Sequence, residues 1–261
     1  MDTLLALIRA LHLAGLMSVF GACALLLQLE PGEAAPRRWV LLWGAVLSAV
    51  AVLAQVLLAP GLTTVPIARG GVLTILTLLC LRDGLILPKA ILAGAALGLI
   101  AAESHAAKAG GASLLYAGID ALHLLAAAYW VGGLTILAPA AIATPRDLPR
   151  LIRLLHGFAR WAAPSVGVLL VAGAANGFII LGAPGVHWTS RYVILLALKM
   201  VLAAIMVALA LTNRLGVLPG LERGDREAEE TIPLTIIAEL SCAVAILVIV
   251  GFLAVIPPLQ A

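Results

Sequence analysis

Long runs of apolar residues alternate with short polar segments along nearly the whole chain of 261 residues. A run of roughly 18 or more apolar residues is long enough to cross the hydrocarbon layer of a bilayer, roughly 30 Å, as an α-helix. The pattern predicts eight such helices, at residues 3–29, 38–59, 64–81, 85–102, 113–141, 162–181, 190–213 and 232–256. The predicted fold class is therefore all-α, a polytopic protein with eight transmembrane helices in the lipid bilayer.

Composition agrees with this class, since 63% of the residues are hydrophobic and only 11% are charged. A net charge of +3 would suggest an acidic partner in a soluble protein, but here it reflects arginines at helix ends, and no nucleic acid is expected as a partner. Cys23, Cys80 and Cys242 each stand alone inside an apolar run. They are interpreted as small buried hydrophobic residues, not as a disulfide framework or a paired-thiolate metal site.

The distribution of basic residues predicts the orientation in the membrane. Of the 16 Lys and Arg residues, eleven lie in or beside the first, third, fifth and seventh loops, and Lys199 lies within a span. The opposite side has only four, namely Arg9, Arg69, Lys108 and Arg191. Cytoplasmic loops are enriched in Lys and Arg, so the odd-numbered loops are predicted to be cytoplasmic and both termini periplasmic. The seventh loop, "LERGDREAEE" (221–230), is expected to be a solvated linker.

One segment of the chain occurs twice. The sequence "IRALHLAGLMSVFGACALL" (8–26) aligns without gaps with "IDALHLLAAAYWVGGLTIL" (119–137), at an offset of 111 residues. The alignment matches His12 with His123 and Gly21 with Gly132. Four crossings separate the two segments, so both helices run in the same direction. We infer a parallel four-plus-four pseudo-twofold repeat, with one half at residues 1–112 and the other at residues 113–261.

The repeated histidines are the main candidates for a functional site. His12 and His123 lie in the outer halves of the first and fifth predicted helices, whereas His156 is expected at the cytoplasmic surface. An imidazole in hydrocarbon is costly unless it has a partner or faces a polar cavity, so such a residue indicates function by default. The alternative is a histidine that only bonds to a neighbouring helix. Neutral imidazole binds copper, zinc, nickel or haem iron, and the pattern does not choose among them.

Polar residues near these histidines leave further alternatives open. Asp120 lies on the same helix face as His123 and either orients its imidazole, ligates directly, or forms an ion pair with Arg9. Glu103 and His105 form an outer acid–imidazole pair that either captures a cation or belongs to an ordinary loop. His187, beside a tryptophan, fits an interfacial anchor at least as well as a ligand.

Three polar residues are predicted deeper in the membrane, namely Asn176, Lys199 and Glu239. The depths of Lys199 and Glu239 differ by roughly 10 Å at a rise of 1.5 Å per residue, a distance that a long lysine partly spans. One interpretation is a buried Lys199–Glu239 pair that joins adjacent helices. The other is a polar or proton-coupling step on an inward path from the histidines.

Several segments resemble the CopD copper-resistance family of bacterial inner-membrane proteins. They are "SHAAKAGG", "DALHLLAAAYWVGGL" (120–134), "GFARWAAPSVGVLLVAGAANGFIILG" (157–182), "SRYVILLALKMVLAAIMVALALTNRLGVLP" (190–219) and "AEL" (238–240). The resemblance implies an eight-helix protein that moves copper from periplasm to cytoplasm, often supplied by a periplasmic CopC-type copper chaperone. It also implies family positions at His105, His123, Trp130, Arg160, Arg191, Lys199, Asn213, Arg214 and Glu239, of which only the histidines are chemically suited to ligate copper.

We therefore predict a multi-pass inner-membrane protein that takes up copper through His12 and His123, supported by His105 and Asp120. An enzyme is not expected, because the sequence has no Ser–His–acid set, P-loop or dinucleotide fingerprint. The alternative function is a haem b-binding membrane redox protein with His12 and His123 as axial ligands. A third is an accessory subunit in which the histidines only join helices.

Overall fold

The computed structural model describes residues 2–29, 38–58, 64–103, 113–143, 147–182 and 188–256. Within these ranges all regular structure is helical, which confirms the predicted all-α class. The elements are α1 (Asp2–Leu26), α2 (Arg38–Leu58), α3 (Thr64–Cys80), α4 (Ile86–Ala102), α6 (Ser113–Ile142), α7 (Leu148–Leu181), α8 (Arg191–Thr212), the π-helical turn η1 (Asn213–Val217), α9 (Leu218–Arg223) and α10 (Arg226–Leu253).

Each predicted span contains a helix, but the helices differ in length. Six helical runs among the described residues are long and apolar enough to cross a membrane, and α3 and α4 are shorter apolar helices. The latter two have 17 residues each. At 1.5 Å per residue this corresponds to about 26 Å, slightly less than the hydrocarbon layer. The protein is therefore a multi-pass membrane protein.

Two predicted cytoplasmic loops are helical instead, which corrects the sequence analysis. Helix α7 begins at Leu148, well before the predicted residue 162, because Leu151, Leu154, Leu155 and Phe158 recur at helical spacing and are buried on one face. The predicted linker at 221–230 is also mostly helical. Its only break is at Gly224 and Asp225, where Gly224 has φ 74° and ends α9 in the left-handed conformation that favours glycine.

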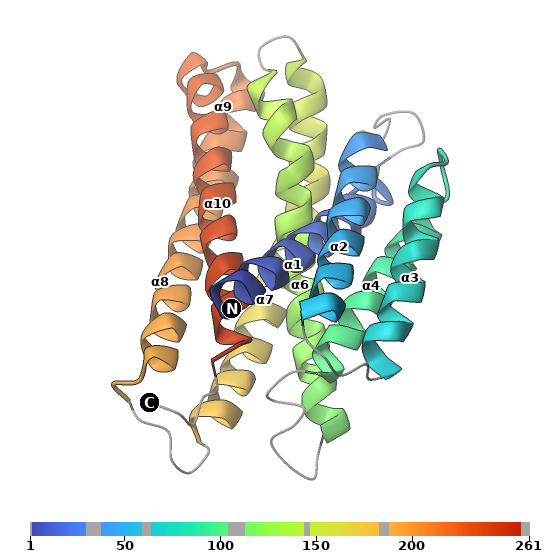
Figure 1. Ribbon diagram of the computed structural model, residues 1–261. Coiled ribbons are helices and arrows are strands. Elements are labelled where there is room, and N and C mark those ends of the chain that lie inside the picture. The colour runs from blue at the N-terminus through green and yellow to red at the C-terminus, as the bar shows by residue number, and fades with distance from the viewer. Residues whose placement is uncertain are drawn as a thin grey trace.

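The connections between helices gather at two opposite ends of the molecule. Figure 1 shows the α3–α4 and α9–α10 connections and the end of α6 at the top, while α7 ends and α8 begins at the bottom. The α3–α4 connection is held by Lys89, whose Nζ donates to the carbonyl oxygens of Arg82 and Gly84 at 2.8 and 2.7 Å. Lys89 is one of the eleven basic residues in or beside the odd-numbered loops, but its side chain is buried.

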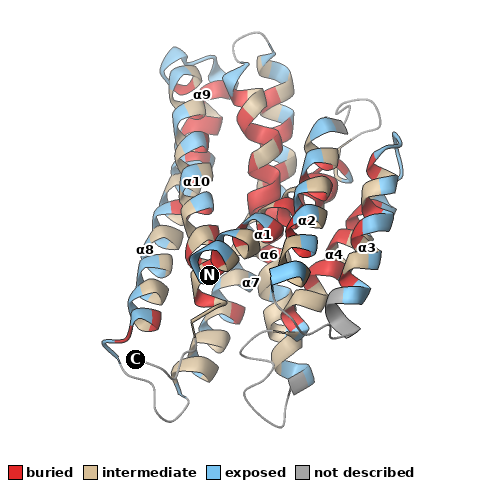
Figure 2. Cartoon of the chain, in the orientation of Figure 1, coloured by how far each residue is buried: buried red, intermediate tan, exposed pale blue. Residues whose placement is uncertain are grey.

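Helices α1 and α6 form the centre of the bundle, and in Figure 2 buried residues gather on them. Buried residues make up 56% of the membrane window of each, against 6% for α7 and for the α8–α9 run. Small residues permit this packing. A Cβ added to Gly15 would meet the Gly44 backbone of α2, and one added to Gly251 of α10 would meet the Ala6 backbone. Peripheral α7 and α8 therefore present their apolar side chains to lipid.

Candidate functional site

His12 lies on α1 and is almost completely buried, with 3% of its surface exposed. Its Nδ1 lies 3.2 Å from the backbone oxygen of Ser48 and 2.7 Å from Ser48 Oγ, both on α2. A carbonyl oxygen only accepts hydrogen bonds, so in the tautomer that donates to it the proton lies on Nδ1 and Nε2 carries a lone pair. The Nε2 atom is buried and has no hydrogen-bond partner among the residues that the structure describes. His12 therefore presents a free ligand atom inside the protein.

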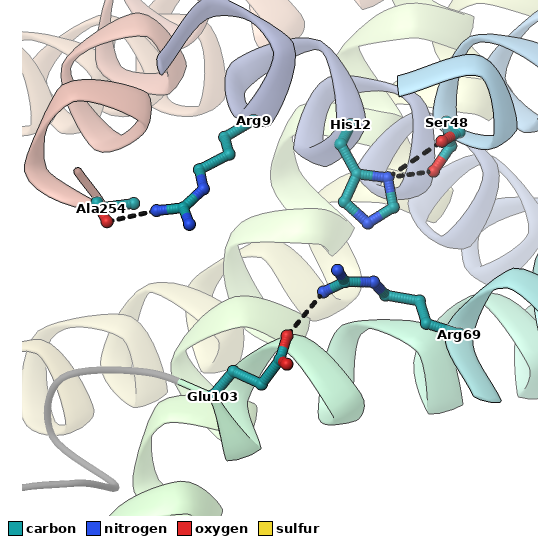
Figure 3. A network of polar contacts seen from close by, with 6 residues as sticks. All are labelled: Arg9, His12, Ser48, Arg69, Glu103 and Ala254. Carbon is teal, nitrogen blue, oxygen red and sulfur yellow. Dashed lines mark hydrogen bonds and ion pairs between the residues drawn. The ribbon is translucent and has the colours of Figure 1, made fainter. Parts of the chain in front are cut away.

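An arginine-rich network surrounds this imidazole (Figure 3). Arg69 of α3 is buried and forms an ion pair with Glu103, at 3.1 Å, at the end of α4. Arg9 donates to the backbone oxygen of Ala254 and also interacts electrostatically with Glu103. Two guanidinium groups thus share one carboxylate next to His12, which makes this cluster cationic. The expected partner of Glu103, His105, lies outside the described residues, and the described partner is Arg69.

His123 occupies the corresponding place on α6. Its Nδ1 lies 3.2 Å from the Leu169 backbone oxygen on α7, so its Nε2 also has a lone pair. Its ring lies against Gly173, where an added Cβ would be 3.1 Å from the imidazole. A larger residue at 173 would press directly on the ring. Both histidines are therefore oriented by a carbonyl on the following helix, as metal-binding histidines commonly are.

Asp120, Asn176 and Lys199 gather near His123 from three helices. Asn176 Nδ2 of α7 donates to Asp120 Oδ1 at 2.9 Å, and Lys199 of α8 interacts electrostatically with both Asp120 and His123. The charges of Asp120 and Lys199 balance, so this cluster is neutral overall. His187, predicted near the same side of the membrane, lies outside the described residues.

The two repeated segments meet in a reciprocal contact. A Cβ added to Gly21 would overlap the Ala128 carbonyl of α6, and one added to Gly132 would overlap the Met17 carbonyl of α1. Gly21 and Gly132 are matched in the repeat, as are Met17 and Ala128. Residue pairs exchanged in this way are typical of a contact around a twofold axis.

The two imidazoles do not share a partner across this contact. His12 bonds to α2 and His123 bonds to α7, the helix that follows each of them. A bis-histidine haem requires both rings to face one iron, and this arrangement gives a shared haem no support. In the described part of the chain, no three His, Cys, Asp or Glu side chains are grouped to hold a metal ion. A metal ion bound at either histidine would therefore need ligands other than a cluster of three such described side chains.

A second polar network lies deeper in the bundle. Glu239 of α10 accepts hydrogen bonds from Trp130 Nε1 at 3.1 Å and from Asn213 Nδ2 at 2.7 Å. Asn213 opens the π-helical turn η1, a distortion that is often found at functional sites. The predicted Lys199–Glu239 pair is wrong, since Glu239 bonds to Trp130 and Asn213 whereas Lys199 interacts with the Asp120 cluster. The packing of α8 sets the direction in which the Lys199 side chain points, and the depth of the residue in the membrane does not reveal that direction.

Sequence reasoning missed Ser48 altogether. The available signal was its spacing from Gly44, because two small residues four apart are typical of close helix contacts in membranes. The surface assignment of His156 is confirmed, because its side chain is 55% exposed and bonds to Glu222 at 2.6 Å. Burial of Cys23 and Cys80 is also confirmed, while Cys242 is half-buried.

Comparison with known proteins shows which family this chain is similar to. Residues 152–253 match the family model described as copper resistance protein D. The chain is 31% identical to Copper resistance protein D of Pseudomonas syringae pv. tomato over 180 aligned residues. The aligned region covers 64% of this chain and 58% of the relative. The chain is therefore similar to the CopD family, most clearly over residues 152–253. The family-matched region contains Asn176, Lys199, Asn213 and Glu239. His12 and His123 lie outside it.

A second CopD-like relative is Inner membrane protein YebZ of Escherichia coli (strain K12), which is 31% identical over 139 residues, or 53% of this chain and 48% of the relative. The chain thus spans about half to three-fifths of the length of these curated relatives. No solved structure matches the chain.

Proposed function

We propose that this protein takes up copper from the periplasmic side of the bacterial inner membrane toward the cytoplasm and is not an enzyme. The observation that carries the proposal is the pair of oriented histidines in a chain similar to a copper-resistance family. The excess of Lys and Arg in the odd-numbered loops supports an orientation with both termini in the periplasm. A separate periplasmic CopC-type chaperone is the proposed donor of copper.

Histidine Nε2 atoms are the proposed copper ligands. At both His12 and His123, the proton on Nδ1 is held by a backbone carbonyl, which supports an Nε2 lone pair that is ready to bind metal. Since the two rings bond to different helices, they act as separate stations instead of as one shared site. Copper passes both stations on its way inward, so the loss of either one lowers uptake.

Electrostatics favours the His123 station as the first to bind a cation. Asp120 balances Lys199 there, whereas His12 lies beside Arg69 in a cluster with one excess positive charge. A monovalent copper ion is repelled less than a divalent ion by that excess. At the His123 station, Asp120 is proposed to act either as a copper ligand or through its hydrogen bond to Asn176. His105 is proposed to capture the ion first.

A parallel four-plus-four repeat with eight crossings is the proposed architecture, with halves at residues 1–112 and 113–261. The reciprocal contact of Gly21 and Gly132 supports a pseudo-twofold axis between α1 and α6. The packing supports it too, because α1 packs on α2, α4 and α10 while α6 packs on α7, α10 and α4. These sets correspond when each helix is exchanged for its counterpart.

Copper binding and uptake test the proposal together. Purified protein is assayed for copper per chain and by optical spectroscopy, and copper uptake is measured in membrane vesicles. His12→Ala and His123→Ala are each expected to lower uptake at least about tenfold, since a lost ligand costs more than a lost neighbour of a ligand. The matched control, His156→Ala at the exposed end of α7, should retain uptake. Equal uptake by all three variants, or a Soret band with stoichiometric iron, contradicts the proposal.

A further inference from the structure

Glu239 is a buried carboxylate without a counter-ion in the described part of the chain. Only 2% of its surface is exposed, and it lies within the membrane-spanning part of α10. Both of its oxygens accept hydrogen bonds, Oε2 from Trp130 Nε1 and Oε1 from Asn213 Nδ2. Its interactions in the described chain are with these two neutral side chains and with no Lys, Arg or His. A charged carboxylate in such surroundings is costly and marks a functional group.

Each partner of Glu239 is oriented to donate. Thr235 Oγ1 donates to Asn213 Oδ1 at 2.6 Å, which turns the amide NH2 of Asn213 toward Glu239. An indole N–H has no acceptor capacity. The surrounding groups therefore satisfy the ionised carboxylate, but they offer no acceptor to the O–H of a protonated one. Protonation weakens both hydrogen bonds, because a neutral carboxyl group is a poorer acceptor than a carboxylate, and it adds an O–H for which these two side chains offer no acceptor.

Other ionisable groups on the elements packed against α10 interact elsewhere. Helices α1, α6, α8 and α9 and the turn η1 pack against α10. Their ionisable groups have other described neighbours or lie at the ends of the bundle: Asp2, Arg9, His12, Cys23, Tyr116, Asp120, His123, Tyr129, Arg191, Tyr192, Lys199, Arg214, Glu222 and Arg223. His12 bonds to Ser48, His123 to Leu169, and Arg214 to Ala159. Glu239 is thus the group in this network that changes charge.

We propose that Glu239 is a proton-binding site whose protonation loosens the contact between α6 and α10. The carboxylate takes one proton from a hydronium ion, whose O–H bond breaks to leave water, and the new O–H bond makes Glu239 a neutral carboxylic acid with weaker hydrogen bonds to Trp130 and Asn213. A proton fits better than a metal ion because the two neighbours direct hydrogens, not lone pairs, at the carboxylate.

The position of the site connects it to copper movement, a link that rests on the proposed function. Asp120, His123 and Trp130 lie on one side of α6, and Trp130 is seven residues, or about 10 Å, inward of His123. Protonation of Glu239 weakens the hydrogen bond that holds Trp130, and so loosens the α6 segment just below the His123 station. A proton bound at Glu239 is therefore positioned to influence the path that copper takes inward.

Tryptophan fluorescence of the purified full-length protein tests the proton site without copper. Indole emission is recorded from about pH 4 to about pH 9, the range in which a carboxyl group titrates in proteins. Wild type should show one reversible transition, since the Trp130 environment changes with the charge of Glu239. Glu239→Gln and Trp130→Phe should each remove it, and Glu239→Asp should keep a transition at a displaced midpoint. The matched control Glu103→Gln, which changes a carboxylate in the other polar network, should keep it unchanged.

Several outcomes overturn the proton site. They are a wild-type emission that does not vary with pH, a transition that survives in Glu239→Gln, and a transition produced by sodium or copper at constant pH. Circular dichroism checks that each variant is folded, and if Glu239→Gln is not, Trp130→Phe and Glu239→Asp decide. Because no copper is added in the titration, its failure leaves the copper uptake proposal standing, and a failure of copper uptake leaves the titration result unaffected.

Discussion

The crossing of α1 and α6 should be intolerant of a single methyl group. In Gly132→Ala, the new Cβ overlaps the Met17 carbonyl and the Gly21 backbone, which are not flexible side-chain ends. The two helices must move apart, and overpacking of this kind costs about 1–3 kcal/mol or more. Replacing a helical glycine by alanine gains about 1 kcal/mol of helix propensity, which offsets part of that cost. The expected net effect is a loss of about 0–2 kcal/mol or more in the free energy of unfolding, and about 1–3 kcal/mol or more relative to a glycine-to-alanine change without the overlap.

A matched control separates the contact from helix propensity. Gly167 lies on α7, and nothing lies within 4 Å of a Cβ added there, so Gly167→Ala should be neutral or more stable than wild type. Unfolding is followed by circular dichroism in mixed micelles with increasing denaturing detergent. If Gly132→Ala is as stable as Gly167→Ala, the close crossing is refuted.

The reciprocity of the crossing has its own signature. Gly21→Ala should destabilise by an amount similar to Gly132→Ala, because its Cβ meets the Ala128 carbonyl in the matching way. Once one substitution has moved the helices apart, the second has less to displace. The double variant should therefore lose less stability than the sum of the single variants, as expected for residues in contact. Strict additivity contradicts a shared contact.

Three further substitutions have defined outcomes in the same unfolding assay. Glu103→Gln leaves the buried guanidinium of Arg69 without its carboxylate and should cost about 1–3 kcal/mol, less than a fully buried pair because Glu103 is partly exposed. Lys89→Met leaves the carbonyls of the α3–α4 turn without their donor and should cost about 2–3 kcal/mol. Ser48→Ala removes the hydroxyl from His12 but not the backbone carbonyl, so it should cost only about 1 kcal/mol. The control is Glu222→Gln, which removes one partner of an exposed pair and should change stability by less than about 0.5 kcal/mol. An equally small effect of Glu103→Gln would contradict the network in Figure 3.

The fold was largely predictable because a long run of apolar residues identifies a membrane helix from local composition alone. All the predicted spans contain helices, and most boundaries agree within a few residues. The errors fell where helices leave the apolar layer. The first part of α7 and the α9–α10 junction are amphipathic or charged, so hydropathy marks them as loops although their backbones are hydrogen-bonded as helices.

The candidate site was predictable in its residues but not in its partners. His12, His123, Asp120 and Glu239 stand out in sequence because polar groups are rare in hydrocarbon. Their partners Ser48, Leu169, Asn176 and Trp130 lie on other helices, and two of them contribute only a backbone oxygen or an indole. Such partners give little signal in a single sequence.

The sequence by itself determined the depth of each polar group along its helix, and the tertiary structure decided which groups meet. Depth follows from a rise of 1.5 Å per residue, which local hydrogen bonds impose on any helix. Contact depends on how far each helix is rotated and how closely it crosses its neighbours. Here Gly21 and Gly132 bring two backbones together, so His12 and His123 turn outward to different helices. The same packing places Trp130 and Asn213 around Glu239, which leaves Lys199 with Asp120.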